Sequence, residues 1–330
     1  MLGFGDSRPR YCVKFGSHAL AWGERCLNWR GRRRYRCVVS PLPAGAAKLS
    51  PIEPNVVDPV VLEERLRTLA GPGPALRVGS HVLLPELPRS VTVLIPDLSA
   101  RMTVLALDHV PSQRQELEAL IRWKLGQEQQ LPLAGMKLAW QVFPPAHGEP
   151  GTSVIFVAAV QQGIVAQYES LCESVGLSPR AVTVTTAELF NLWLRAAGGR
   201  RRLARDLACL TVLDDALTCV IFHHGRPVFV RTKFLSADGQ DTIGERANEE
   251  KILREIAASF LACQERHPDV AVKEIVLMTE EGSRRLEDRL AHEWSATVDR
   301  LAWEHVRALG WTPSGGNTSS AVLPVVAAMV

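Results

Sequence analysis

The segment LACLTVLDDALTCVIFHHGRPVFVRT, residues 207–232, decides the fold of this chain. It contains three apolar runs, at 207–213, 217–222 and 227–232, with only a few residues between one run and the next. Runs rich in β-branched and aromatic residues and separated by short turns are typical of neighbouring antiparallel strands. The segment therefore predicts a three-stranded meander.

The chain begins in the same way. Residues 11–23 and 34–40 predict strands of a second meander, with turns at Gly16 and Gly31. Each meander is followed by helices and further strand signals, such as the helix predicted over 58–70 and the strand predicted over 274–278. A repeated order of this kind predicts a duplicated α/β lobe, the architecture of actin, Hsp70 and hexokinase.

The middle of the chain has a different order. Strands are predicted at 92–96, 102–107, 137–143 and 153–160, and a helix that opens at Ser112 lies between the second and third of them. The last of these strands is apolar on both faces, so we expect it inside its sheet. The fold class predicted is therefore α/β, an actin-like (ribonuclease H-like) two-lobed fold with an inserted strand-helix-strand-strand subdomain.

The same pattern predicts a division of the chain into four segments. Residues 1–98 form the first part of one lobe, and 99–177 form the inset. Residues 178–200 return to the first lobe, and 201–330 form the second lobe.

Composition excludes several classes of protein. The 330 residues carry a formal net charge of +3 and are 46% hydrophobic and 22% charged, an ordinary globular mixture. Neither a signal peptide nor an apolar run of about 20 residues is found. The seven cysteines are widely spaced, without a C-x-x-C motif, so we expect buried free thiols in a cytosolic protein.

The chain lacks specific catalytic motifs. Neither G-x-x-x-x-G-K-[ST], a G-x-G-x-x-G after a strand, H-E-x-x-H nor G-x-S-x-G is found. The pair His223-His224 precedes Gly225 at a predicted hairpin turn, and a metal site there needs a third ligand. We therefore expect two exposed turn histidines, no metal site and no catalytic residue.

A cluster of arginines lies on the first predicted hairpin, beside Trp29 and Tyr35. Its members are Arg30, Arg32, Arg33, Arg34 and Arg36. Such a cluster fits a solvated hairpin tip, contact with an anionic membrane surface or acidic partner, or nucleic-acid binding. The nearly balanced charge of the rest of the chain argues against nucleic acid.

Residues 92–196 resemble the PilM family, the actin-like cytoplasmic subunit of type IV pilus assembly. The resemblance rests on VTVLIPD at 91–97, IRWKLGQEQQLP at 121–132, Trp140, and VIFVAAVQQGIVAQYESLCESVGLSPRAV at 154–182. It implies that the inset is an SHS2-type subdomain. Similar architecture occurs in the cytoplasmic part of the type II secretion subunit GspL and in the division protein FtsA.

The nucleotide loops depart from the family pattern at three places. The first loop, D-I-G-S in active members, matches Lys14, Phe15, Gly16 and Ser17. If Thr218 matches the family threonine, the second acid position holds Val212, although Asp214 or Asp215 could restore an acid in a shifted register. The closing T-G-G-G matches Thr279, Glu280, Glu281 and Gly282. We therefore expect a degenerate ATP site, without a cofactor and without ATP hydrolysis.

The resemblance also implies a role and a partner. It predicts a non-catalytic scaffold or docking subunit, cytoplasmic and peripheral to the inner membrane, which binds the N-terminal cytoplasmic peptide of a PilN-like bitopic membrane protein in a groove beside the inset. Other pilus platform or motor proteins are expected as partners, and nucleic acid is not. Three alternatives stay open: an ATPase that uses Asp214 or Asp215, a GspL-like secretion subunit, and an RNA-binding module built on the arginine hairpin.

Overall fold

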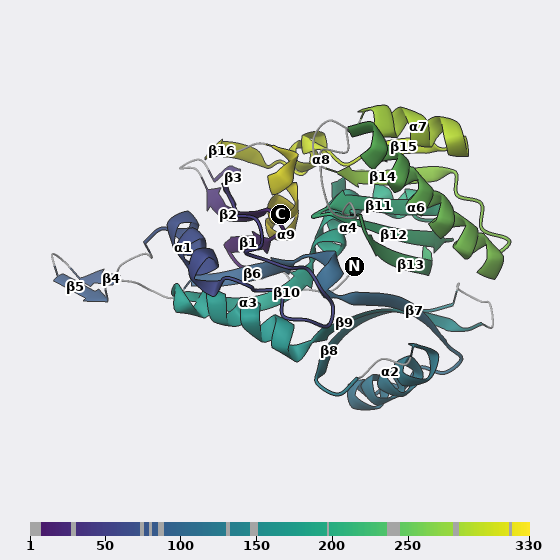
Figure 1. Ribbon diagram of the computed structural model, residues 1–330, viewed down its shortest axis with the longest axis horizontal. Coiled ribbons are helices and arrows are strands. Elements are labelled where there is room, and N and C mark those ends of the chain that lie inside the picture. Colours follow the sequence, from purple (N-terminus) through teal and green to yellow (C-terminus); the bar gives the residue numbers. More distant parts are fainter. Residues whose placement is uncertain are drawn as a thin grey trace.

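The structure is a computed structural model that describes most of the chain (Figure 1). The described residues are 8–27, 31–72, 76–78, 81–84, 89–129, 133–145, 151–196, 198–235, 245–279, 284–316 and 319–330. Two larger sheets, one smaller three-stranded sheet and the helices packed on them make up the architecture.

The first sheet has the strand order β10-β6-β1-β2-β3-β16. Strands β1, β2 and β3 form an antiparallel meander, whereas β6 and β10 continue the sheet parallel to β1. The strands are β1 (Tyr11–Phe15), β2 (Ala19–Leu27), β3 (Arg33–Pro41), β6 (Arg89–Ile95), β10 (Leu177–Val184) and β16 (Thr312–Gly316).

The second sheet repeats this topology, with the order β13-β12-β11-β14-β15. Its first three strands again form an antiparallel meander, and β14 and β15 again continue it in parallel. The strands are β11 (Leu207–Leu213), β12 (Ala216–His223), β13 (Arg226–Phe234), β14 (Glu274–Thr279) and β15 (Thr297–Arg300). The predicted meander at 207–232 and the predicted duplication are both confirmed.

The inset is a separate sheet with the order β7-β9-β8, covered by one helix. Its elements are β7 (Arg101–Leu107), α2 (Arg114–Gln129), β8 (Met136–Phe143) and β9 (Ser153–Gln161). The chain order strand, helix, strand, strand and the central position of β9 agree with the sequence prediction. A small hairpin, β4 (Leu76–Val78) with β5 (His81–Leu84), projects from the first lobe (Figure 1).

Helices cover the outer faces of the two larger sheets and fill the space between them (Figure 1). The outer helices are α1 (Pro59–Ala70) and α3 (Gln162–Ser174) on the first sheet, and α6 (Glu245–Arg266) and α7 (Arg284–Trp294) on the second. The core between the sheets contains α4 (Thr185–Ala196), α8 (Trp303–Ala308) and α9 (Leu323–Met329). The remaining short helices are α5 (Gly199–Arg202), η1 (Asp97–Ser99) and η2 (Ser320–Val322).

Helix α9 lies directly on β2, because Gly23 leaves room for it. A Cβ atom at Gly23 would lie 2.3 Å from Cγ1 of Val325 and 2.6 Å from Cε of Met329. The residues of α9 are buried throughout, as their apolar sequence LPVVAAM requires. Both β16 and α9 therefore complete the first lobe, although they follow the second lobe in the chain.

All seven cysteines are free thiols, and six of them are buried, as predicted. Cys26 is the exception and is half-buried. Among the described residues, we find no helix with the length and apolar character needed to span a membrane.

Candidate functional site

Two hairpin turns, one from each lobe, meet at residues 14–18 and 214–215, and this junction is called the inter-lobe cleft. The turn between β1 and β2 is closed by a hydrogen bond from the amide of Gly16 to the carbonyl of Ala19, at 3.0 Å. The turn between β11 and β12 consists of Asp214 and Asp215, whose φ angles are 51° and 57°. Two successive left-handed residues suit a two-residue hairpin, but they are costly for side chains other than glycine, so the Asp-Asp sequence is an unusual choice.

An ion pair joins the two turns. Nζ of Lys14 lies 2.8 Å from Oδ1 and 2.7 Å from Oδ2 of Asp214, and the two side chains are only 6% and 9% exposed. The second aspartate, Asp215, pairs with Nε2 of the exposed His18 at 2.7 Å. Lys14 and Asp214, singled out separately from the sequence, are thus brought into direct contact. Asp214, one of the two acids that a shifted register would supply, lies at this turn, and the ammonium group of Lys14 compensates its charge.

Gly16 is required by this close approach. A Cβ atom there would lie 2.4 Å from Oδ1 of Asp214, 2.9 Å from the carbonyl oxygen of Ala19 and 3.3 Å from Nζ of Lys14. The φ angle of Gly16 is not in the left-handed region, so the reason for glycine is space and not backbone conformation. The first loop therefore packs against Asp214 itself.

A buried carboxylate, Asp97, provides the second polar link between the lobes. It follows β6 and accepts hydrogen bonds from the amide of Thr186 at 3.0 Å, from the hydroxyl of Thr186, and from the hydroxyl of Thr218 at 2.9 Å. Burial raises the pKa of Asp97, the three hydrogen bonds oppose this, and the nearby charge of Asp214 raises the pKa further. A first-lobe acid is thus held by a second-lobe threonine.

Sequence reasoning quoted Asp97 only as part of a motif and assigned it no role, and it passed over Thr186. A signal did exist: a charged residue directly after an apolar strand and a proline is an unusual end for a buried element. The sequence alone does not reveal that a threonine of the other lobe completes its hydrogen bonds.

The other predicted nucleotide-loop residues lie near these turns or outside the described residues. Val212 and Thr279 are half-buried neighbours on the parallel strands β11 and β14. Oγ of Ser17 is buried and has no hydrogen-bond partner among the described residues. Gly282, with Glu280 and Glu281, lies outside the described residues.

An apolar pocket of about 60 Å³ lies where the inset, helix α4 and the second sheet meet. The inset contributes Met102, Phe143 and Phe156 to its lining. Helix α4 and the second lobe contribute Thr186, Ala187, Phe190, Asn191, Leu194, Leu203, Cys209, Val220, Phe222 and Pro227. One water needs roughly 10–15 Å³ of such space, so the pocket has room for several waters or one aliphatic side chain.

One polar group in this lining lacks a partner. Asn191 is 5% exposed, and its Nδ2 atom is buried without a hydrogen-bond acceptor among the described residues. An unpaired buried donor is costly, so such groups in native proteins call for an explanation, such as a partner that binds there. The rings of Phe190 and Phe222, which stack at 4.8 Å, form the apolar wall beside it.

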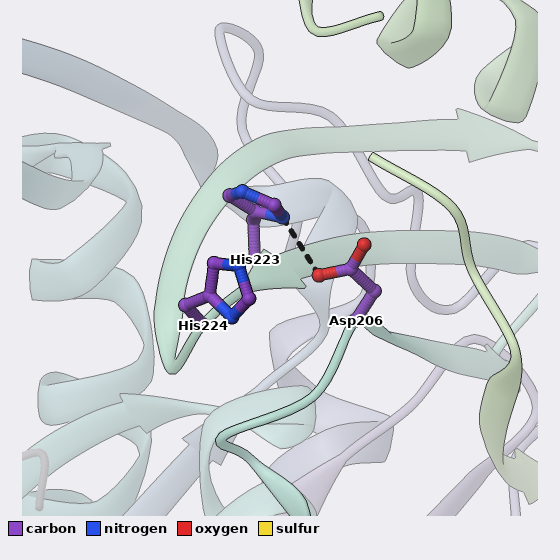
Figure 2. A group of neighbouring side chains, drawn as sticks. All are labelled: Asp206, His223 and His224. Atoms are coloured by element: carbon purple, nitrogen blue, oxygen red, sulfur yellow. Dashed lines mark hydrogen bonds and ion pairs between the residues drawn. The ribbon is translucent and has the colours of Figure 1, made fainter. Parts of the chain in front are cut away.

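The two turn histidines differ from each other in the structure (Figure 2). His224 is exposed, as predicted, whereas His223 is half-buried and its Nδ1 lies 2.7 Å from Oδ1 of Asp206. The prediction that both histidines are exposed was therefore wrong for His223. Sequence reasoning missed Asp206, because it lies in the arginine-rich segment before β11.

The arginines of the cluster differ from one another in their contacts and in their exposure. Arg34 is half-buried and donates to the carbonyl of Pro313 on β16 at 3.0 Å, and Arg33 lies over the ring of Trp311 at 5.9 Å. Arg32 and Arg36 are exposed, and Arg30 lies outside the described residues. Tyr35 is buried and stacks on Trp303 at 5.6 Å, so it belongs to the core and not to the charged surface.

The arrangement of the two sheets can now be compared with known structures. The chain is similar to a chain of the solved "PilM-PilN type IV pilus biogenesis complex", with a TM-score of 0.69 and 17% sequence identity over 98% of this chain and 100% of that chain. The chain has an actin-like fold. This finding confirms the predicted fold class.

Two weaker structural likenesses accompany it. One is a Bacteroides thetaiotaomicron protein with an actin-like ATPase fold, with a TM-score of 0.45 and 11% identity over 93% of this chain and 98% of that chain. The other is the cytoplasmic domain of EpsL of the Vibrio cholerae type II secretion system, with a TM-score of 0.46 and 11% identity over 96% and 92% of the two chains. No protein-family model matches the chain, and no curated protein matches it by sequence.

Proposed function

We propose that this actin-like chain is a non-catalytic docking subunit of a type IV pilus or related secretion platform at the inner membrane. The observation that carries the proposal is the buried ion pair between Lys14 and Asp214. It lies between the two lobes, where an actin-like subunit with intact nucleotide loops would hold Mg–ATP. The lobes are joined there by the protein's own side chains, and a nucleotide is not needed to bridge them.

The cleft residues do not fit Mg–ATP. Magnesium is bound through oxygen ligands, usually one or two carboxylates with waters and phosphates. Here a lysine stands at the first acid position, and the nearby carboxylate of Asp214 already binds that lysine. Separating a buried ion pair costs about 3–5 kcal/mol when one partner is left uncompensated. Nucleotide binding would have to recover that free energy first.

Calorimetry with Mg–ATP tests the absence of nucleotide binding. The full chain should show no binding at concentrations up to about 1 mM, which corresponds to less than about 4 kcal/mol of binding free energy. A micromolar dissociation constant would overturn this part of the proposal. Thermal unfolding of the same sample, with and without Mg–ATP, controls for inactive protein.

The pocket beside the inset is the proposed docking site for a partner peptide. The solved structure with the same fold is a complex of PilM with PilN, which supports a PilN-like membrane protein as partner. The pocket would take one apolar side chain of its cytoplasmic N-terminal peptide. The amide of Asn191 would donate to a main-chain carbonyl of that peptide, because this donor is buried and unpaired.

Peptide binding can be measured by fluorescence anisotropy. The probe is the N-terminal cytoplasmic peptide of a single-span membrane protein encoded beside this chain. Phe156→Glu should weaken binding by at least about 30-fold, since central apolar anchors carry about 2 kcal/mol or more of interface free energy. Trp123→Glu, at an exposed aromatic residue on the far helix of the inset, is the matched control and should leave affinity unchanged. Equal losses in both variants would remove the pocket as the docking site.

The arginine hairpin supports a peripheral position at the cytoplasmic face of the membrane. Arg33 and Arg36 are exposed, and each basic residue near an anionic surface contributes about 1 kcal/mol. In vesicle flotation, Arg33→Glu with Arg36→Glu should abolish association with anionic vesicles. Arg34 is left unchanged because it binds Pro313. Undiminished flotation of the double variant would reject this contact.

A further inference from the structure

Three potential metal ligands meet at the end of β12 opposite the Asp214-Asp215 turn. Figure 2 shows how they lie. Asp206 directly precedes β11, His223 ends β12, and His224 begins the turn to β13. Each offers one ligand atom, and these atoms all lie within 4.8 Å of one another. In a tetrahedral zinc site with bonds of about 2.0–2.1 Å, ligand atoms are about 3.4 Å apart, so small side-chain rotations suffice.

The backbone explains why two successive histidines face the same carboxylate. Successive side chains of a strand point to opposite faces of the sheet. His224, however, has a φ of 47° and is followed by Gly225 with a φ of 81°. This left-handed turn brings the His224 ring to the same side as the His223 ring, and the ring centroids are 4.1 Å apart. Two imidazoles therefore converge where a regular strand would separate them.

Contacts outside the cluster already hold the ligands in place. The second oxygen of Asp206, Oδ2, accepts a hydrogen bond from the amide of Ala271 at 2.8 Å, which leaves Oδ1 directed at His223. Nδ1 of His224 lies 3.3 Å from the carbonyl oxygen of Ala204. A carboxylate fixed by a main-chain amide is the type of support that orients ligands in metal sites.

The geometry points to a site for a divalent transition metal of the zinc class, formed by Asp206, His223 and His224. Two imidazole nitrogens and one carboxylate oxygen suit Zn²⁺, Co²⁺ or Ni²⁺, and not Mg²⁺ or Ca²⁺, which prefer oxygen ligands. The metal would take the place of the hydrogen bond between His223 and Asp206. Because His224 is exposed, a solvent molecule would complete the coordination. Such a metal would tie the β12–β13 turn to the segment that enters β11.

Metal titration of the full chain tests the site, with Zn²⁺ in competition with a chromophoric chelator and Co²⁺ as a spectroscopic probe. The wild type should bind one equivalent and show the intense visible absorption of four-coordinate Co²⁺. His223→Gln with His224→Gln should reduce the affinity at least tenfold and abolish that absorption. Asp206→Asn should do the same, because it removes the anionic ligand while keeping the size of the side chain.

A matched control changes two exposed histidines elsewhere, with His109→Gln and His292→Gln. This control variant should bind Zn²⁺ with the affinity of the wild type. Excess Zn²⁺ should raise the melting temperature of the control variant and of the wild type. Circular dichroism of every apo variant verifies folding. Absence of stoichiometric binding by the wild type would overturn the site. The site would also be overturned if the control variant lost as much Zn²⁺ affinity as the site variants do, or if either site variant bound Zn²⁺ with the affinity of the wild type. None of these readouts depends on the proposed docking function.

Discussion

The inter-lobe cleft and the apolar pocket lie close together, but they differ in whether their buried polar groups have partners. In the cleft, the charges of Lys14 and Asp214 compensate each other, and Asp97 is satisfied by hydroxyl and amide donors. In the pocket, the apolar lining is open and the amide of Asn191 lacks an acceptor among the described residues. Under the proposed docking function, the pocket would therefore bind its partner through shape and one hydrogen bond, and not through charge.

The largest expected effect comes from breaking the ion pair of the cleft. Lys14→Met should lower the free energy of unfolding by about 3–5 kcal/mol, because it leaves the charge of Asp214 buried without a partner. Adding Asp214→Asn should restore most of the loss, because asparagine removes the buried charge and tolerates the left-handed backbone at this turn. Urea unfolding monitored by circular dichroism measures both variants.

A surface pair provides the matched control. Lys48→Met removes one partner of the exposed ion pair with Glu53 and should cost less than about 1 kcal/mol. If Lys14→Met lowers the free energy of unfolding no more than Lys48→Met does, the ion pair does not hold the two turns together. The comparison between cleft and pocket would then be wrong.

A smaller effect is expected from filling the space between the two loops. Gly16→Ala should destabilise the protein by about 1–3 kcal/mol, because the new methyl group overlaps Oδ1 of Asp214. Gly163→Ala is the control: a Cβ there meets nothing within 4 Å, and alanine in a helix should add up to about 1 kcal/mol of stability. Thermal melts of the two variants should shift in opposite directions. A Gly16→Ala variant as stable as the wild type would mean that the loops have room to separate.

The pocket should respond in the opposite sense to the cleft. Asn191→Leu should raise the free energy of unfolding by about 1 kcal/mol, since it removes an unpaired buried amide, and should weaken binding of the partner peptide. Asn55→Leu provides the comparison. The Asn55 side chain bonds Ser50, Ser99 and Tyr168, so its loss should cost about 1–3 kcal/mol. Destabilisation by both changes, to a similar extent, would show that Asn191 has a partner in the free protein.

The smallest expected effect is a pH dependence that originates at Asp97. Its pKa is raised by burial, so the folded state holds the proton more tightly than the unfolded state does. Stability relative to Asp97→Asn should therefore be greatest at or below the ordinary carboxyl range near pH 4. It should decline as the pH rises through the raised pKa. Urea unfolding of both proteins across this range measures the difference, and a difference that grows with pH would contradict it.

Much of the fold was predictable because most of its strands consist of strongly apolar runs of residues. The meander at 207–232 and the strand-helix-strand-strand order of the inset agree with the structure almost residue for residue. Three late elements were missed: β15, α8 and β16. The sequence of β16 is TPSGG, which is a poor strand by composition, and it forms only because β3 offers a parallel partner.

The candidate site was predictable only in part. Lys14 and Asp214 were each singled out, but their contact joins residues 200 positions apart and depends on how the two lobes meet. The pocket had no sequence signal, because its lining comes from the inset, α4 and the second sheet. Side chains that are ordinary core residues in each separate element line a pocket only where those elements leave a gap.

The position of α9 on β2 has a consequence for synthesis of the protein. Val325 and Met329 fill the space above Gly23, so the inner face of the first lobe is uncovered until residues 323–329 have left the ribosome. At translation rates of about 5–20 residues per second, the meander of β1, β2 and β3, which ends at Pro41, waits roughly 15–60 seconds for α9. During that interval its apolar face is open to chaperones and to aggregation. The earliest strands of the chain are thus among the last to be completed.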